Sequence, residues 1–194
     1  MMSLLISTRC LTRDKGHASL TQLLLPKLLT TASEPASDVR IVVVGSAGHN
    51  FCKDLDLANT HQADKYSRFT NYGTSKLANM LFARELSKRY PTIKTTTIHP
   101  GQVVTPITRG VNQSYPMLVP IFFFLKQLFF VSVQEGAKTQ LWACVSKDAQ
   151  SGHYYDPVGK EGAMSKYAKD EKMDGVLWDW TEQELAKHGS PGWP

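Results

Sequence analysis

A tyrosine and a lysine stand four positions apart in a stretch of strong helix formers, Tyr72 and Lys76. On a helix, residues at this spacing share one face, so the ammonium group of Lys76 can approach the phenol of Tyr72. A free tyrosine loses its proton at about pH 10, and a nearby cation stabilises the anion that proton exchange at neutral pH requires. The pair therefore has the composition of an acid–base unit, although Tyr-x-x-x-Lys also occurs by chance at helix starts.

Two loops that follow predicted strands add polar groups to this pair. A β-branched run at residues 39–44 is followed by Gly45 and Ser46, and a second predicted strand at 93–98 is followed by a Pro-Gly loop at 99–105. Ligands of parallel α/β sheets bind beyond the carboxyl ends of the strands, so we expect both loops at one edge of a sheet. A strand-end serine, a Tyr/Lys helix and a strand-end Pro-Gly loop in this order are jointly more specific than any one of them.

Predicted helices and strands alternate along the chain. Helices are predicted at 17–31, 72–89, 133–147 and 171–187, and strands at 39–44, 93–98 and 152–155. Pro26 is expected to kink or end the first helix, and residues 50–71 are polar and irregular. The near-continuous apolarity of 39–44 is typical of a strand covered on both faces, so the alternation indicates an α/β fold with parallel strands.

Composition favours one globular domain in a reducing compartment. The chain has 194 residues, of which 42% are hydrophobic, enough for a core of its own. Its formal net charge of +5 comes from basic residues interspersed with acidic ones, which argues against nucleic acid as a partner. The three cysteines lie far apart and one must stay unpaired, which favours a cytoplasmic location; neither they nor the six histidines have the spacing of a metal site.

The most apolar segment covers residues 115–133 and is rich in phenylalanine. A membrane span needs about 20 nearly uninterrupted apolar residues, and this segment is interrupted by two prolines and by Lys126-Gln127. We interpret it as a buried or substrate-covering helix. Peripheral contact with a membrane is the second interpretation.

Three segments resemble those of short-chain dehydrogenases/reductases, most closely retinol-dehydrogenase-like members of fungal type: 39–46, 72–79 and 99–105. The similarity extends from Gly16 to about Gly189. It implies a partial Rossmann-type doubly wound sheet, the C-terminal half only, with about three parallel strands and flanking helices. By this resemblance, residues 1–15 are a segment foreign to the family and 16–194 are the catalytic part of a single domain.

The resemblance implies roles for three catalytic side chains. Ser46 would hydrogen-bond the substrate oxygen, and Tyr72 would donate or accept the proton. Lys76 would stabilise the anion of Tyr72 and bind the nicotinamide ribose. Hydride would pass between nicotinamide and a carbon atom of the substrate, while the protein supplies orientation and electrostatics at the oxygen.

The resemblance also implies a nicotinamide cofactor, NADP or NAD. The residues expected to contact it are Tyr72, Lys76, Pro100, Gly101, Val103 and Thr105. The Pro-Gly turn and Thr105 would hold the carboxamide, and the Phe-rich segment would shape a pocket for an apolar alcohol, ketone or aldehyde.

The sequence departs from the family's pattern at its N-terminal side. It contains no glycine-rich G-x-x-x-G-x-G turn for the pyrophosphate, no Asn-Asn-Ala-Gly segment and no residue to read the adenosine ribose, and Arg13 stands where the family has an active-site Asn. We therefore expect weak cofactor binding, weak or absent activity, and an unpaired apolar edge at 39–44 that promotes aggregation or association.

Two other functions are compatible with part of this pattern. A non-catalytic member of the same family could act as an interaction protein, forming a homo-oligomer through the 72–89 helix. A sugar-nucleotide epimerase shares Tyr-x-x-x-Lys, but the His-Pro-Gly loop at 99–101 and the short C-terminal region argue against it.

Overall fold

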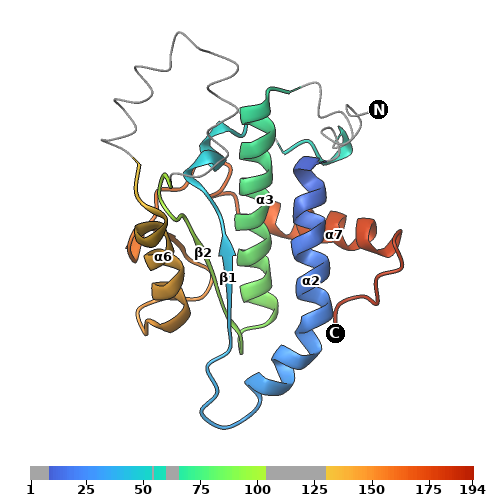
Figure 1. Ribbon diagram of the computed structural model, residues 1–194. Coiled ribbons are helices and arrows are strands. Elements are labelled where there is room, and N and C mark those ends of the chain that lie inside the picture. Colours follow the sequence, from blue (N-terminus) through green and yellow to red (C-terminus); the bar gives the residue numbers. More distant parts are fainter. Residues whose placement is uncertain (1–8, 54, 60–65, 104–129) are drawn as a thin grey trace.

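The computed structural model describes residues 9–53, 55–59, 66–103 and 130–194 (Figure 1). Thr105 and most of the Phe-rich segment lie outside these residues, as does the predicted pocket or membrane contact there. The helices are α2 (Arg9–Ala32), α3 (Arg68–Arg89), α6 (Val133–Val145) and α7 (Lys172–Ala186), with short 3-10 helices η1 (Ala47–Phe51) and η2 (Leu57–Asn59). The strands are β1 (Arg40–Val44), β2 (Lys94–Ile98), β3 (Tyr154–Asp156) and β4 (Lys160–Glu161).

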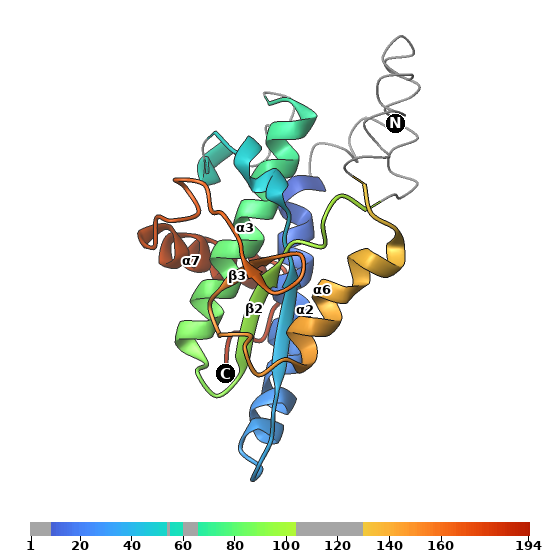
Figure 2. The same cartoon turned by 90° about the vertical axis from the view of Figure 1, so that its left-hand side faces the viewer.

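The strands form one sheet in the order β1-β2-β3-β4. β1, β2 and β3 pair in parallel, with Val44 opposite Ile98, and β4 pairs with β3 antiparallel. Helices α2 and α3 cover one face and α6 covers the other, while α7 packs on the outer side of α3 (Figures 1 and 2). The predicted α/β fold with three parallel strands is confirmed. Strand β4 was not predicted, because both of its residues are exposed and carry no apolar pattern.

Pro26 does not end the first helix, which continues to Ala32. The proline lies at an exposed position of α2, so its ring is on the solvent side and not on the packed face of the helix. The predicted end of the helix at Pro26 was therefore wrong, and the predicted kink stays a prediction.

α3 begins earlier than predicted, at Arg68 and not at Tyr72. Ser67 is its N-cap, and the Ser67 hydroxyl accepts a hydrogen bond from the N–H of Thr70. The polar composition of 50–71 concealed this start, because a cap and a first turn need no apolar residues. Tyr72 consequently lies in the second turn of an established helix.

The main core lies between α3, α7 and the sheet. Trp178 of α7 is 1% exposed, and its indole stacks on Phe82 of α3 with ring centroids 5.5 Å apart. Trp193 packs on the same indole, with centroids 4.3 Å apart. Burying a large apolar side chain contributes about 1.5–3 kcal/mol, so these contacts are a main source of the attachment of α7 to α3.

A buried ion-pair network joins the same two helices. The Asp174 carboxylate is fully buried, and both of its oxygens accept hydrogen bonds from the Arg84 guanidinium at 2.7 Å. Lys88 adds a third contact, 3.0 Å from Nζ to Oδ2. Arg84 also donates to the carbonyl of Ala168 at 2.6 Å. The charges are thus paired and hydrogen-bonded, as burial of a carboxylate requires.

Replacing this buried carboxylate should unfold the chain at much lower denaturant concentration. Asp174→Asn leaves Arg84 without its counter-charge, and the loss expected for breaking such a pair is about 3–5 kcal/mol of unfolding free energy. Glu171→Gln is the matched control, because Glu171 meets Lys88 at an exposed position and should change little. Urea denaturation of both variants measures the difference; equal losses would contradict the assignment.

Candidate functional site

Ser46 lies just beyond the carboxyl end of β1 and caps the N-terminus of η1. Its hydroxyl oxygen accepts a hydrogen bond from the N–H of Gly48 at 3.0 Å. In that bond the oxygen acts as acceptor, so the hydroxyl proton remains available for a bond to another oxygen. The predicted position of a serine at a strand tip is the observed one.

Two glycines bring α3 onto the loop that carries Ser46. A Cβ atom on Gly48 would lie 2.4 Å from Cε1 of Tyr72 and 3.2 Å from the hydroxyl oxygen of Ser46. A Cβ atom on Gly73 would lie 2.6 Å from the backbone nitrogen of Cys52. Only glycine fits at either contact. The Tyr72 ring and the Ser46 hydroxyl therefore flank the same point of backbone.

Lys76 lies one helical turn beyond Tyr72 and faces the end of β1. Its Nζ atom is 5.9 Å from the centroid of the Tyr72 ring and donates a hydrogen bond to the carbonyl of Val44 at 2.9 Å. Asn79 donates to the same carbonyl at 3.3 Å. The Tyr72 side chain is 41% exposed, so a small molecule can reach it. Ser46, Tyr72 and Lys76 thus meet at one edge of the sheet.

The Pro-Gly loop leaves the sheet at this same edge. Val44 and Ile98 are paired, and Ser46 and Pro100 each follow their strand by two residues. Gly101 adopts a φ of 85°, in the left-handed region that favours glycine. Val103 forms a parallel bridge with Val131 and packs against the first turn of α6. Pro100 and Val103 lie next to α6, and Gly101 lies beside Pro157 and Val131; Thr105 lies beyond the described residues.

Two buried aromatic side chains behind Ser46 were not predicted as part of the site. His49 is fully buried, and its ring packs edge-on against Tyr154, with centroids 5.4 Å apart. Tyr154 is 4% exposed, and burial raises the pKa of its phenol, so this tyrosine stays protonated and neutral. The sequence showed only that His49 is near Ser46, since its packing partner belongs to a distant strand.

His99 follows β2 and is half-buried at the same edge. Burial is the main cause that lowers its pKa; His49 lowers it further, whereas Asp156 opposes the shift. Within the described part of the chain, its Nδ1 atom is buried without a hydrogen-bond partner. The fold therefore favours the neutral imidazole at this position.

This shift makes stability depend on pH. Because the folded chain binds a proton at His99 less readily than the unfolded chain, unfolding free energy should fall as the pH drops below about 6.5. Above that pH the ring is neutral in both states and the contribution is constant. His99→Gln should flatten the dependence between about pH 7.5 and 5.5, measured by urea denaturation at each pH. An unchanged slope in the variant would contradict the prediction.

Neither a metal centre nor a membrane span is found in the described ranges. No group of three or more His, Cys, Asp or Glu side chains there is arranged to hold a metal ion. Among the helices of those ranges, none combines the length and apolarity that crossing a bilayer requires.

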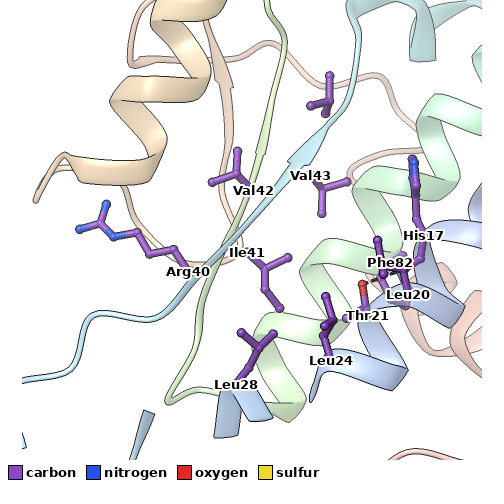
Figure 3. A pocket seen from close by; sticks show the side chains of 11 residues that line it. His17, Leu20, Thr21, Leu24, Leu28, Arg40, Ile41, Val42, Val43 and Phe82 are labelled. Carbon is purple, nitrogen blue, oxygen red and sulfur yellow. Dashed lines mark hydrogen bonds between the residues drawn. The ribbon is translucent and has the colours of Figure 1, made fainter. Parts of the chain in front are cut away.

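A separate apolar hollow of about 360 Å³ lies between α2 and β1 (Figure 3). Ile41 and Val43 face α2 across it, whereas Val42 points to the opposite side of the strand. Three leucines of α2 remain strongly exposed nearby: Leu20 at 57%, Leu23 at 63% and Leu24 at 48%. The hollow is distinct from the Ser46 and Tyr72 side chains, which do not line it.

Within the described residues, the backbone of β1 beside this hollow has no strand partner on its outer side. Among the described strands, β1 pairs only with β2, through bonds such as Gly45 N–H to Ile98 and Lys94 N–H to Val39. Because bonding groups alternate along a parallel strand, the backbone groups of Arg40, Val42 and Val44 point to the other side. The unpaired apolar edge expected from the sequence is therefore present in this part of the structure.

The sequence is similar to named proteins, although no family model matches it. It is 35% identical over 172 residues to retinol dehydrogenase 14 of Homo sapiens, covering 86% of this chain and 48% of that protein. It is 34% identical to the short-chain dehydrogenase/reductase drtF of Aspergillus calidoustus, covering 89% and 59%. A solved structure of a putative uncharacterized protein from Mycobacterium paratuberculosis superposes with a TM-score of 0.60 at 26% identity, covering 87% of this chain and 55% of that one. The chain spans about half the length of the curated relatives it matches.

Proposed function

Since the chain belongs to the short-chain dehydrogenase/reductase family, we propose that it carries the acid–base part of an NAD(P)-dependent oxidoreductase. The resemblance to retinol-dehydrogenase-like and fungal members is confirmed by the relatives above. The proposed reaction moves a hydride between the nicotinamide and the carbon of an apolar alcohol, ketone or aldehyde. The observation that carries the proposal is the meeting of the Ser46 hydroxyl and the Tyr72 ring at Gly48.

The proposed roles follow from this geometry. The Ser46 hydroxyl donates a hydrogen bond to the substrate oxygen, and the exposed Tyr72 phenol transfers a proton to or from the same oxygen. The Lys76 ammonium, 5.9 Å from the Tyr72 ring, stabilises negative charge on the phenol. Its bond to the Val44 carbonyl fixes the cation at the strand end while Tyr72 reacts.

The residues present fit only the nicotinamide end of the cofactor. Lys76 lies beside the exposed Tyr72, where it would hold the nicotinamide ribose. The Pro100–Val103 loop leaves the sheet at the same edge, where it would hold the carboxamide. The cofactor supplies the hydride chemistry when bound. The sequence carries no glycine-rich turn for the pyrophosphate, so we propose weak binding and slow turnover by residues 1–194.

The test is oxidation of NADPH or NADH by the purified chain with a long-chain aldehyde such as decanal. We expect slow turnover, which Tyr72→Phe reduces to the uncatalysed rate, because proton transfer by a positioned side chain contributes about 100-fold or more. Tyr66→Phe is the matched control, because the Tyr66 hydroxyl donates to Asp56 and has no part in the proposed proton transfer. Full turnover in Tyr72→Phe would refute the acid–base role, and rapid turnover by the unmodified chain would refute the weak-binding proposal.

A second candidate function is that of an interaction protein, and the open edge of β1 favours it. The sequence suggested association through the 72–89 helix, but residues 77–83 of that helix are all buried within the chain. The exposed leucines lie on α2 instead. An extended apolar segment paired with β1 would place alternate side chains in the hollow beneath α2 (Figure 3).

If association uses this surface, charge placed on α2 should abolish it. The double variant Leu20→Lys/Leu24→Lys keeps strong helix formers in α2 while it places two cations at the hollow. It should convert oligomers or aggregates into monomer. Leu141→Lys on α6 is the control, since Leu141 is 63% exposed and lies on the other face of the sheet. Size-exclusion chromatography with light scattering measures the monomer fraction. Equal effects of both variants would indicate general solubilisation and refute the proposed surface.

A further inference from the structure

His49 is the one fully buried imidazole among the described histidines, and both of its ring nitrogens are hydrogen-bonded. Nε2 accepts a bond from the backbone N–H of Ser165 at 3.1 Å. A nitrogen that accepts carries no proton, so the neutral ring has its proton on Nδ1. Nδ1 therefore donates to the carbonyl of Ser46, 2.8 Å away. The two bonds fix both the tautomer and the plane of the ring.

The Nε2 side of the imidazole is held by the C-terminal part of the chain. Ser165 lies 116 residues further along the chain, and its hydroxyl accepts from the N–H of Ala168 in the turn that leads to α7. The edge-on contact with the buried Tyr154 ring restrains the imidazole from another side. His49 thus ties the loop after β1 to the C-terminal part of the fold.

The Nδ1 side of the imidazole is hydrogen-bonded to the carbonyl of Ser46. The Ser46 carbonyl accepts from Nδ1 and also from the His49 backbone N–H, at 3.1 Å. These bonds hold the peptide that leads to Gly48, whose N–H in turn bonds the Ser46 hydroxyl oxygen at 3.0 Å. Without the Nδ1 bond the Ser46 carbonyl would keep only the bond from the His49 backbone N–H, and the loosened peptide would hold the hydroxyl direction less firmly.

We propose that His49 is a positioning residue that sets the Ser46 hydroxyl against Tyr72, acting through the Ser46 carbonyl. Its own ring is fully buried and does not reach a substrate. Its effect on turnover rests on the proposed function, whereas its effect on Ser46 geometry does not. The two ring nitrogens have separate roles: the bond from Nδ1 positions Ser46, and the bond to Nε2 anchors the ring.

Two substitutions isolate these bonds. The amide nitrogen of Asn in His49→Asn can take the place of Nδ1, and the amide oxygen of Gln in His49→Gln can take the place of Nε2. We expect His49→Gln to speed hydrogen exchange of the Gly48 amide about tenfold relative to His49→Asn, since one hydrogen bond is lost at the Ser46 peptide. Turnover of decanal should fall about tenfold in His49→Gln with KM unchanged, and less in His49→Asn.

The Gly48 exchange rate is the deciding measurement. Equal Gly48 exchange in the two variants, corrected for urea-measured stability, would show that His49 only holds the fold together. Absence of turnover in the unmodified chain would count against the proposed function, while the exchange comparison still tests His49. If neither variant folds, ¹⁵N NMR of the histidines in the unmodified chain decides: a proton on Nδ1 supports the proposal and a proton on Nε2 overturns it.

Discussion

The close backbone approach of α3 to η1 is the constraint on which the site depends. At Gly73 and Gly48 the helix and the loop are separated by less than the width of a methyl group. This approach sets the Tyr72 ring beside the Ser46 hydroxyl, and it lets Lys76 reach back to the last carbonyl of β1. Any larger side chain at either glycine would separate the serine from the tyrosine, even if every polar group remained.

Local signals in the sequence predicted much of the fold. The β-branched run at 39–44 and the helix formers after Tyr72 gave the strands and helices that carry Ser46, Tyr72 and Lys76, because periodicity and strand-end position are local properties. The start of α3 was missed because a Ser67 cap leaves no apolar pattern. The role of each site residue stays a prediction.

Contacts between distant segments could not be predicted from a single sequence. The partner of His49 lies 116 residues away, and the pair Arg84–Asp174 is separated by 90. No spacing rule connects such positions, because they meet only after the sheet and α7 have packed. The buried polar groups that hold the C-terminal part against the sheet edge therefore emerge only from the folded chain.

The Val44 carbonyl sets a limit on growth of the sheet. This oxygen points to the open side of β1 and already accepts two bonds, from the Lys76 ammonium and the Asn79 amide. A carbonyl has two lone pairs, so it has no acceptor capacity left for the main chain of a neighbour. A strand added here could bond to the backbone at Arg40 and Val42 but not at the Val44 oxygen. The backbone pairing of such a strand would stop before Ser46, so the strand would leave Ser46 and Tyr72 uncovered.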